Sequence, residues 1–170
     1  MLFPTTADVI RVIHRTLETG ILPALKGTEQ ESAAVTMGHM LRYLALRVEL
    51  EGPRLAEDIA KLRSTLVRIE PYLKARGYED ARALALHQSV EQSLNSMPDI
   101  ADYRDIAQLA AEVSALRRTV CLGIDFFQAQ TALDAEGSKA RDLLLEYISW
   151  EVMQDAELMD PPFEGFGARR

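Results

Sequence analysis

The chain has 170 residues, of which 48% are apolar and 26% charged, and its formal net charge is −7. This length and composition are typical of one globular domain with its own core and exclude a disordered chain. A protein this acidic repels phosphate backbones and anionic lipids, so we expect neither a nucleic acid nor a membrane surface as its partner.

The only cysteine, Cys121, excludes an intramolecular disulfide, which fits a reducing compartment. No secretory signal precedes the first helical pattern, and no apolar stretch is long enough to cross a bilayer. We therefore expect a cytoplasmic protein.

The first predicted helix covers about residues 6–20. Thr5 and Asp8 have the spacing of a capping box, in which side-chain oxygens satisfy the free N–H groups of the first turn. After this helix, Pro23 lies in an apolar stretch that predicts a buried connection or a distorted last turn. The apolar residues of the helix are Val9, Ile10, Ile13 and Leu17.

A second helix is predicted over about residues 29–51, beginning at a capping box formed by Thr28 and Glu31. Gly52 and Pro53 should end this helix and begin the next one. A stripe at heptad-like spacing predicts its buried face. The stripe comprises Ala34, Met37, Leu41, Leu44 and Val48.

The third predicted helix, about residues 54–75, carries the clearest pattern of the chain. Its apolar residues recur at alternating steps of four and three, which places them on one side of a helix. Asp58 falls near its N-terminal end, Pro71 should kink its last turns and Gly77 should end it. The stripe comprises Leu55, Ile59, Leu62, Leu66, Ile69 and Leu73.

Three further helices are predicted, over about residues 79–95, 100–130 and 139–158, with a loop at 131–138. No segment alternates apolar and polar residues as a half-buried strand would. We therefore predict an all-α protein, a single-domain bundle of five to six helices packed up and down. Residues 161–170 should form an irregular tail. The apolar face of the fifth helix comprises Ile106, Leu109, Val113, Leu116, Val120 and Ile124.

Two histidines have a glutamate four residues later, which places each pair on one helix face: His14 with Glu18, and His87 with Glu91. Imidazole and carboxylate are normal ligands of zinc or iron, so these four residues are the candidates for a metal site inside a bundle. No histidine has a glutamate three residues before it, as di-iron bundles require. We therefore expect two pairs at the surface or at the boundary of the core, and no bound metal or other cofactor.

Other candidates have simpler structural explanations. His39, Arg42 and Tyr43 could bind an anion, but such residues commonly cover the flank of an amphipathic helix. Cys121 lies in mid-helix among apolar residues, which predicts a buried small side chain rather than a nucleophile. Tyr147, Trp150 and Met153 could line a pocket, although their spacing is typical of a core. No triad, dyad or phosphate-binding loop is present, and no catalytic residue is predicted.

Phe163 and Phe166 stand in the tail among prolines and glycines, where nothing local can bury them. We expect both rings to pack on helices of their own chain or of a second copy.

The first third of the chain resembles the opening of an uncharacterised helical bacterial family. The resemblance covers about residues 5–70 and rests on three stretches: Thr6-Ala-Asp-Val-Ile-Arg, Ile21-Leu-Pro-Ala-Leu, and Arg47-Val-Glu-Leu-Glu-Gly. Genes of this family commonly lie beside acyl-CoA dehydrogenases and aminoglycoside-phosphotransferase-like kinases. The resemblance implies no catalytic residue, but it implies an accessory role in acyl-CoA or aromatic-compound catabolism.

These observations favour a non-catalytic protein that binds another protein or forms a homodimer. The alternative is a bundle that binds a small ligand or a metal, as an accessory to enzymes of acyl-CoA or aromatic-compound catabolism.

Overall fold

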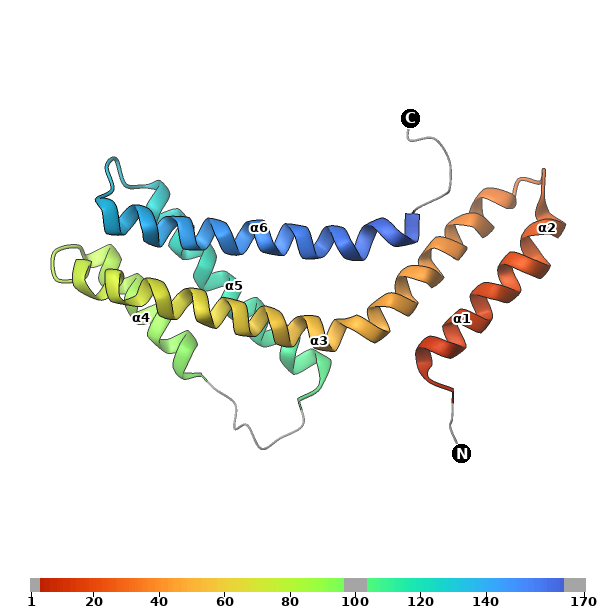
Figure 1. Ribbon diagram of the computed structural model, residues 1–170, viewed down its shortest axis with the longest axis horizontal. Coiled ribbons are helices and arrows are strands. Elements are labelled where there is room, and N and C mark those ends of the chain that lie inside the picture. The colour runs from red at the N-terminus through yellow and green to blue at the C-terminus, as the bar shows by residue number, and fades with distance from the viewer. Residues whose placement is uncertain (1–3, 97–103, 164–170) are drawn as a thin grey trace. The chain divides into compact units, whose positions relative to one another are not determined.

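The computed structural model describes residues 4–96 and 104–163, and the surroundings of side chains as far as residue 156. Every regular element in these residues is a helix, which confirms the all-α prediction (Figure 1). The elements are α1 (Thr6–Thr16), the π-helical turn η1 (Leu17–Ile21), α2 (Leu22–Leu25), α3 (Glu31–Arg76), α4 (Ala81–Asn95), α5 (Ile106–Gln128) and α6 (Ala135–Phe163).

The chain divides into two compact units. The N-terminal unit contains Met1–Gly52 together with Met153–Arg170, and the central unit contains Pro53–Val152. The boundary between residues 52 and 53 falls inside α3, so this helix contributes its first half to one unit and its second half to the other.

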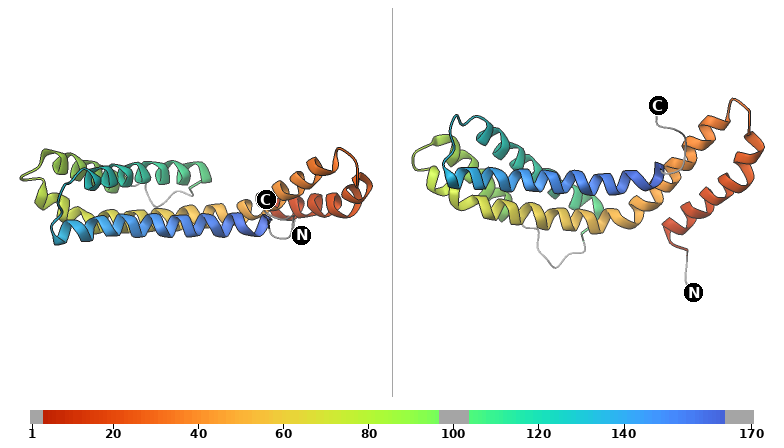
Figure 2. Two further views of the ribbon diagram at one scale, coloured as in Figure 1. Left: turned by 90° about the horizontal axis from the view of Figure 1, so that it is seen from above. Right: turned by 45° about the horizontal axis from the view of Figure 1, so that its top comes forward.

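The central unit is built in two layers (Figure 2). The second half of α3 and α6 run side by side in opposite directions, and α4 and α5 form the other layer. The predicted stripe of α3 faces the core between these layers, because its side chains are buried and Leu55 packs at their edge. This confirms the stripe as core. Its buried members are Ile59, Leu62, Leu66, Ile69 and Leu73.

Helices α5 and α6 complete this core. Val113, Leu116 and Val120 of α5 are buried as predicted, whereas Ile106 at the start of the helix is exposed. A Cβ atom added at Gly123 would lie 2.9 Å from Cδ1 of Leu144, which is fully buried on α6. The backbone of α5 therefore approaches the side chains of α6 as closely as only glycine permits.

The N-terminal unit contains an antiparallel hairpin, in which α1 lies beside the first half of α3 (Figure 1). The predicted capping box of α1 is confirmed, since Asp8 N–H donates to Thr5 Oγ1 at 3.1 Å and Thr5 N–H donates to Asp8 Oδ2 at 2.9 Å. The predicted distorted last turn is also present, as η1 and α2, but Pro23 in it is exposed rather than buried.

The second predicted capping box is wrong in detail. The Thr28 hydroxyl donates to the Leu25 carbonyl at 2.6 Å, and the Glu31 carboxylate accepts a hydrogen bond from Gly27 N–H at 2.7 Å. Gly27 has a φ of 79°, which a residue with a Cβ atom rarely adopts. The turn therefore uses the same polar residues, but they bind the preceding loop instead of the first turn of α3.

Gly52 and Pro53 do not end a helix, because α3 is continuous from Glu31 to Arg76 and also contains Pro71. Proline has a helix-compatible φ, and its cost inside a helix is a lost hydrogen bond and a crowded carbonyl four residues earlier. The residues on both sides favour helix strongly enough to override that cost. Gly77, by contrast, follows the last residue of α3 as predicted.

The bounds of the last two helices also differ from those predicted. A capping box of Asp105 and Gln108 begins α5 at Ile106, later than residue 100. Helix α6 begins at Ala135, inside the predicted loop, because Gly137 N–H donates to Asp134 Oδ1 at 2.6 Å. It continues to Phe163 through two prolines, although an irregular segment was predicted from residue 161.

Candidate functional site

The two helices of the hairpin meet along a seam of mostly small side chains. Ala7, Ala34 and Ala45 are buried there, with Leu17 as the large apolar side chain among them. A Cβ atom added at Gly38 would lie 3.7 Å from Leu17 Cδ2 of η1 and 3.8 Å from His14 Nε2 of α1, so both elements contact α3 at this point. Small residues let helices approach, but they remove little apolar surface from water.

Large apolar side chains lie outside this seam. On both helices most of them come one residue before a seam position, as Ile13 precedes His14 and Leu44 precedes Ala45. One residue is a turn of about 100° about the helix axis, and equal turns on two antiparallel helices lead to the same side of the hairpin. We call this side the apolar face. It comprises Val9, Ile13, Met37, Met40, Leu44 and Val48, whose exposed fractions lie between 43% and 60%.

The opposite side of the hairpin is charged. Arg11 Nη2 lies 2.5 Å from Glu49 Oε1 across the two helices, and Arg11 Nη1 lies 3.3 Å from Asp8 Oδ1. At the edge of the seam, His14 Nε2 lies 3.3 Å from Glu18 Oε1, which confirms the predicted spacing as a local pair. The hairpin as a whole is therefore amphipathic, with ion pairs on one side and exposed apolar side chains on the other.

The central unit contains a polar network that joins three helices around the buried side chains of Asp58 and Tyr147. Tyr147 of α6 donates to Asp58 Oδ1 of α3 at 2.8 Å, and Arg117 Nη2 of α5 lies 2.7 Å from Asp58 Oδ2 and 2.8 Å from Glu151 Oε1. Burial, and then the hydrogen bond to Asp58, raise the pKa of Tyr147 well above its ordinary value. The phenol therefore stays protonated and serves as a donor, not as an acid–base group at neutral pH.

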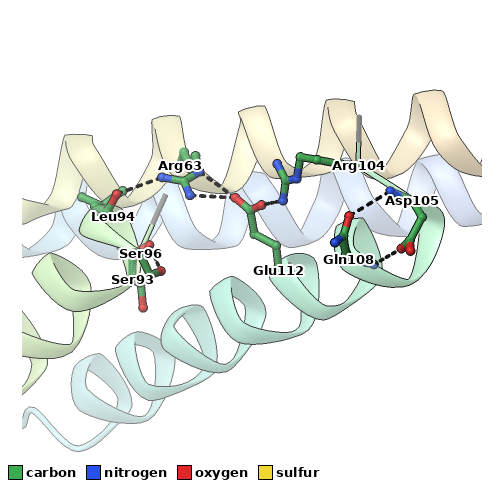
Figure 3. Close-up of polar contacts among 8 residues, drawn as sticks. All are labelled: Arg63, Ser93, Leu94, Ser96, Arg104, Asp105, Gln108 and Glu112. Carbon is green, nitrogen blue, oxygen red and sulfur yellow. Dashed lines mark hydrogen bonds and ion pairs between the residues drawn. The ribbon is translucent and has the colours of Figure 1, made fainter. Parts of the chain in front are cut away.

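A second network holds α3, α4 and α5 together (Figure 3). Arg63 donates from Nε and Nη2 to Glu112 Oε1, at 2.9 Å and 2.7 Å, and from Nη1 to the carbonyl of Leu94 at 3.0 Å. The other oxygen of Glu112 pairs with Arg104. Both oxygens of the carboxylate are thus paired with arginines. The network connects the helices, and Glu112 has no unpaired oxygen that could act on a substrate.

The predicted pair of His87 and Glu91 is joined by a third residue. His87 is buried on α4, with Nδ1 at 3.7 Å from Glu91 Oε2 and Nε2 at 3.3 Å from Glu70 Oε1 of α3. Among the side chains that the structure describes, in residues 4–96 and 104–156, this is the group of histidine and carboxylate residues whose ligand atoms lie close enough to share a metal ion. Sequence reasoning missed Glu70, because its place beside His87 depends on how α3 packs on α4.

Two other predicted candidates differ from expectation. Arg42 Nη2 lies 3.4 Å from His39 Nδ1 as the spacing suggests, but Tyr43 contacts Arg47 instead, with its ring 5.7 Å from the guanidinium. Cys121 is exposed rather than buried, as is Leu122 beside it, because both lie on the side of α5 away from buried Val120.

The aromatic candidates divide between core and surface. Tyr147 is buried and its ring lies 6.1 Å from that of half-buried Trp150, as expected of core residues, whereas Met153 is exposed. Phe163 is the last residue of α6, but its side chain lies outside the described surroundings. Phe166 lies outside the described residues altogether, so the docking of both rings stays a prediction.

Asp58 is a further residue that the sequence placed wrongly. It was expected near the N-terminal end of a helix, whereas α3 is continuous there and Asp58 is buried in its middle. No local pattern in the sequence predicts that Asp58 pairs with Arg117, which is 59 positions later.

Comparison of the chain with protein-family models, with curated proteins and with solved structures finds no match. Among the described residues, no helix is both long and apolar enough to cross a membrane.

Proposed function

We propose that this protein acts through protein–protein interaction, and that the apolar face of its N-terminal hairpin binds the same face of a second copy. The observation that carries the proposal is the composition of that face: six large apolar side chains, all at least 43% exposed, on one side of a hairpin whose own seam is made of small residues. Contiguous exposed apolar patches mark interaction sites in soluble proteins.

A second copy suits this face because a two-fold interface must be complementary to itself. None of the six residues is charged, so two copies can meet there without facing like charges. Residues 1–52 contain six acidic and five basic side chains, a net charge of −1 out of the chain total of −7. The repulsion between two acidic chains is therefore weakest at the hairpin.

The proposed dimer has a common helical geometry. Two amphipathic hairpins packed face to face place four helices around a shared apolar core, which is the arrangement of four-helix bundles. Met37 and Met40 add flexible side chains that adjust to irregular gaps, and methionine is enriched at protein interfaces.

The affinity should be moderate. Completing the burial of a half-exposed side chain of this size contributes about 1 kcal/mol. The twelve side chains of a dimer then contribute on the order of 12 kcal/mol, against an association cost of roughly 4–15 kcal/mol. The dimer should accordingly dissociate on dilution.

We further propose that the protein works in the cytoplasm, which its single cysteine supports. The acyl-CoA-related context implied by the resemblance of residues 5–70 supports an accessory role there.

Sedimentation over protein concentrations of about 1–200 μM, a range that spans moderate affinities, tests the proposal. The wild-type chain should shift from one to two copies as concentration rises. Val48→Glu places a charge in the apolar face and should keep the protein monomeric. Val67→Glu is the matched control: the same substitution on the same helix, at an exposed valine of the central unit.

A wild-type chain that stays monomeric throughout, or two variants that dimerise equally well, would show that a second copy does not bind this face. Vesicles of phosphatidylcholine and phosphatidylglycerol distinguish one other occupant. If wild type co-sediments with them and Val48→Glu does not, the face binds lipid rather than protein.

A further inference from the structure

The group formed by Glu70, His87 and Glu91 differs from the other carboxylate clusters of the central unit. Glu112 is paired with two arginines, and Asp58 and Glu151 share Arg117. Glu70 and Glu91 have only the imidazole of His87 between them, and within the described part of the chain no lysine or arginine pairs with either.

This arrangement leaves uncompensated negative charge beside a buried side chain. When His87 is neutral, the three groups carry two negative charges and no positive one. The imidazole is held in place, since its side chain is only 9% exposed, while the Glu91 side chain is 51% exposed and open to solvent. A cation entering from solvent would meet two carboxylates and a fixed nitrogen donor.

We propose that Glu70, His87 and Glu91 form a binding site for a divalent transition-metal ion, with Zn²⁺ as the best-suited ion. One imidazole nitrogen and two carboxylate oxygens are a donor set that zinc accepts, whereas magnesium and calcium prefer oxygen ligands alone. Three protein ligands leave a fourth position to water. This proposal concerns the central unit and does not depend on the proposed dimer.

The distances permit the site with small side-chain movements. Ligand atoms around a tetrahedral zinc ion lie about 3.3 Å apart, given metal–ligand bonds of roughly 2.0–2.1 Å. Nε2 of His87 and Oε1 of Glu70 are already 3.3 Å apart. One ligand atom of each of the three residues lies within 4.8 Å of the others. Glu91, which has three rotatable bonds and is exposed, can supply the remaining closure.

The two helices give such a site a structural consequence. Glu70 lies on α3 and the other two residues lie on α4, one turn apart. A bound ion would therefore connect α3 to α4 within the folded chain, and binding that requires the folded arrangement raises stability by mass action.

The test is titration of zinc chloride into metal-free full-length protein, followed by calorimetry and by thermal unfolding. Wild type should bind one zinc ion per chain and unfold at a higher temperature with zinc than without it. Glu70→Gln and Glu91→Gln should each weaken binding at least about tenfold, because loss of a ligand costs no less than loss of a group that orients one. Magnesium chloride should neither bind nor stabilise.

The matched control is His14→Gln. His14 also has a glutamate four residues later, but among the described side chains no third ligand atom lies near that pair. This variant should bind zinc like wild type, and so should Val48→Glu, whose change lies in the N-terminal unit. Because His87 is buried, His87→Gln is informative only where circular dichroism shows that the variant is folded. Where it is not folded, Glu70→Gln and Glu91→Gln test the proposal.

The proposal is overturned if wild type binds no zinc, or if Glu70→Gln and Glu91→Gln bind it as tightly as wild type.

Discussion

The central unit and the N-terminal hairpin are built from similar amphipathic helices, yet the side chains that they bury differ in size. In the central unit, Leu62, Leu66 and Tyr147 are almost completely buried, and buried polar side chains such as Asp58 have hydrogen-bond partners. In the hairpin, alanines fill the seam, and side chains such as Leu44 are about half exposed. The comparison teaches that an apolar stripe of the same spacing can be buried within the chain in one region and left exposed in another.

The largest expected effect separates these two kinds of stripe directly. Leu66→Ala should lower the free energy of unfolding by roughly 2–5 kcal/mol, because the side chain is fully buried and its removal leaves a cavity. Leu44→Ala, on the same helix, should cost less than about 1 kcal/mol at concentrations where the chain is monomeric. Urea unfolding of both variants measures the difference, and equal losses would mean that the hairpin face is already covered within one chain.

The polar network of the central unit should show itself at high pH. The pKa of Tyr147 is raised in the folded state. The protonated side chain therefore stabilises the fold fully below pH 10, and this stabilisation declines as pH rises toward the folded-state pKa. At neutral pH, Tyr147→Phe should cost about 1–2 kcal/mol through the lost hydrogen bond to Asp58. Above pH 10, the difference in free energy of unfolding between wild type and Tyr147→Phe should then decrease by about 1.4 kcal/mol per pH unit. We call this difference the gap.

Denaturant unfolding at pH 7–11 measures this gap. Tyr78→Phe is the control, because Tyr78 is 86% exposed and its substitution should leave the pH dependence unchanged. A gap that stays constant through pH 11 would show that Tyr147 ionises as readily in the folded chain as in the unfolded one.

The smallest effects come from two helical glycines, and they should differ in sign. Gly123→Ala should destabilise by about 1 kcal/mol, since the new Cβ would lie 2.9 Å from a fully buried leucine and overpacking outweighs the gain in helix propensity. Gly52→Ala should stabilise by up to about 1 kcal/mol, because nothing lies within 4 Å of the added atom. Melting temperatures of the two variants check this, and a shared sign would contradict it.

Sequence reasoning located the helices well because their periodicity is local. The stripe from Leu55 to Leu73 recurs within each turn, and the capping box joins Thr5 to Asp8, only three positions later. Periodicity finds the apolar side of a helix, but it does not tell whether the same chain covers that side. For this reason the stripe containing Met37 and Leu44 was predicted as buried, although those two side chains are exposed.

The candidate metal site shows the same limit. The four-residue step from His87 to Glu91 is visible in the sequence, whereas Glu70 is 17 positions from His87 and joins it only through the packing of two helices. The continuity of α3 through Gly52 and Pro53 was missed for another reason. That dipeptide is a strong local stop signal, and the helix-forming residues around it outweigh it.

The exposed position of Cys121 has a practical consequence for spectroscopy. It is the only cysteine of the chain, and it lies on α5 within the central unit. A nitroxide or fluorophore reactive toward thiols would therefore attach at one defined position without any engineered substitution. In an assembly of two copies, each chain would carry one such label, and the dipolar coupling between the two labels would report their separation in frozen solution.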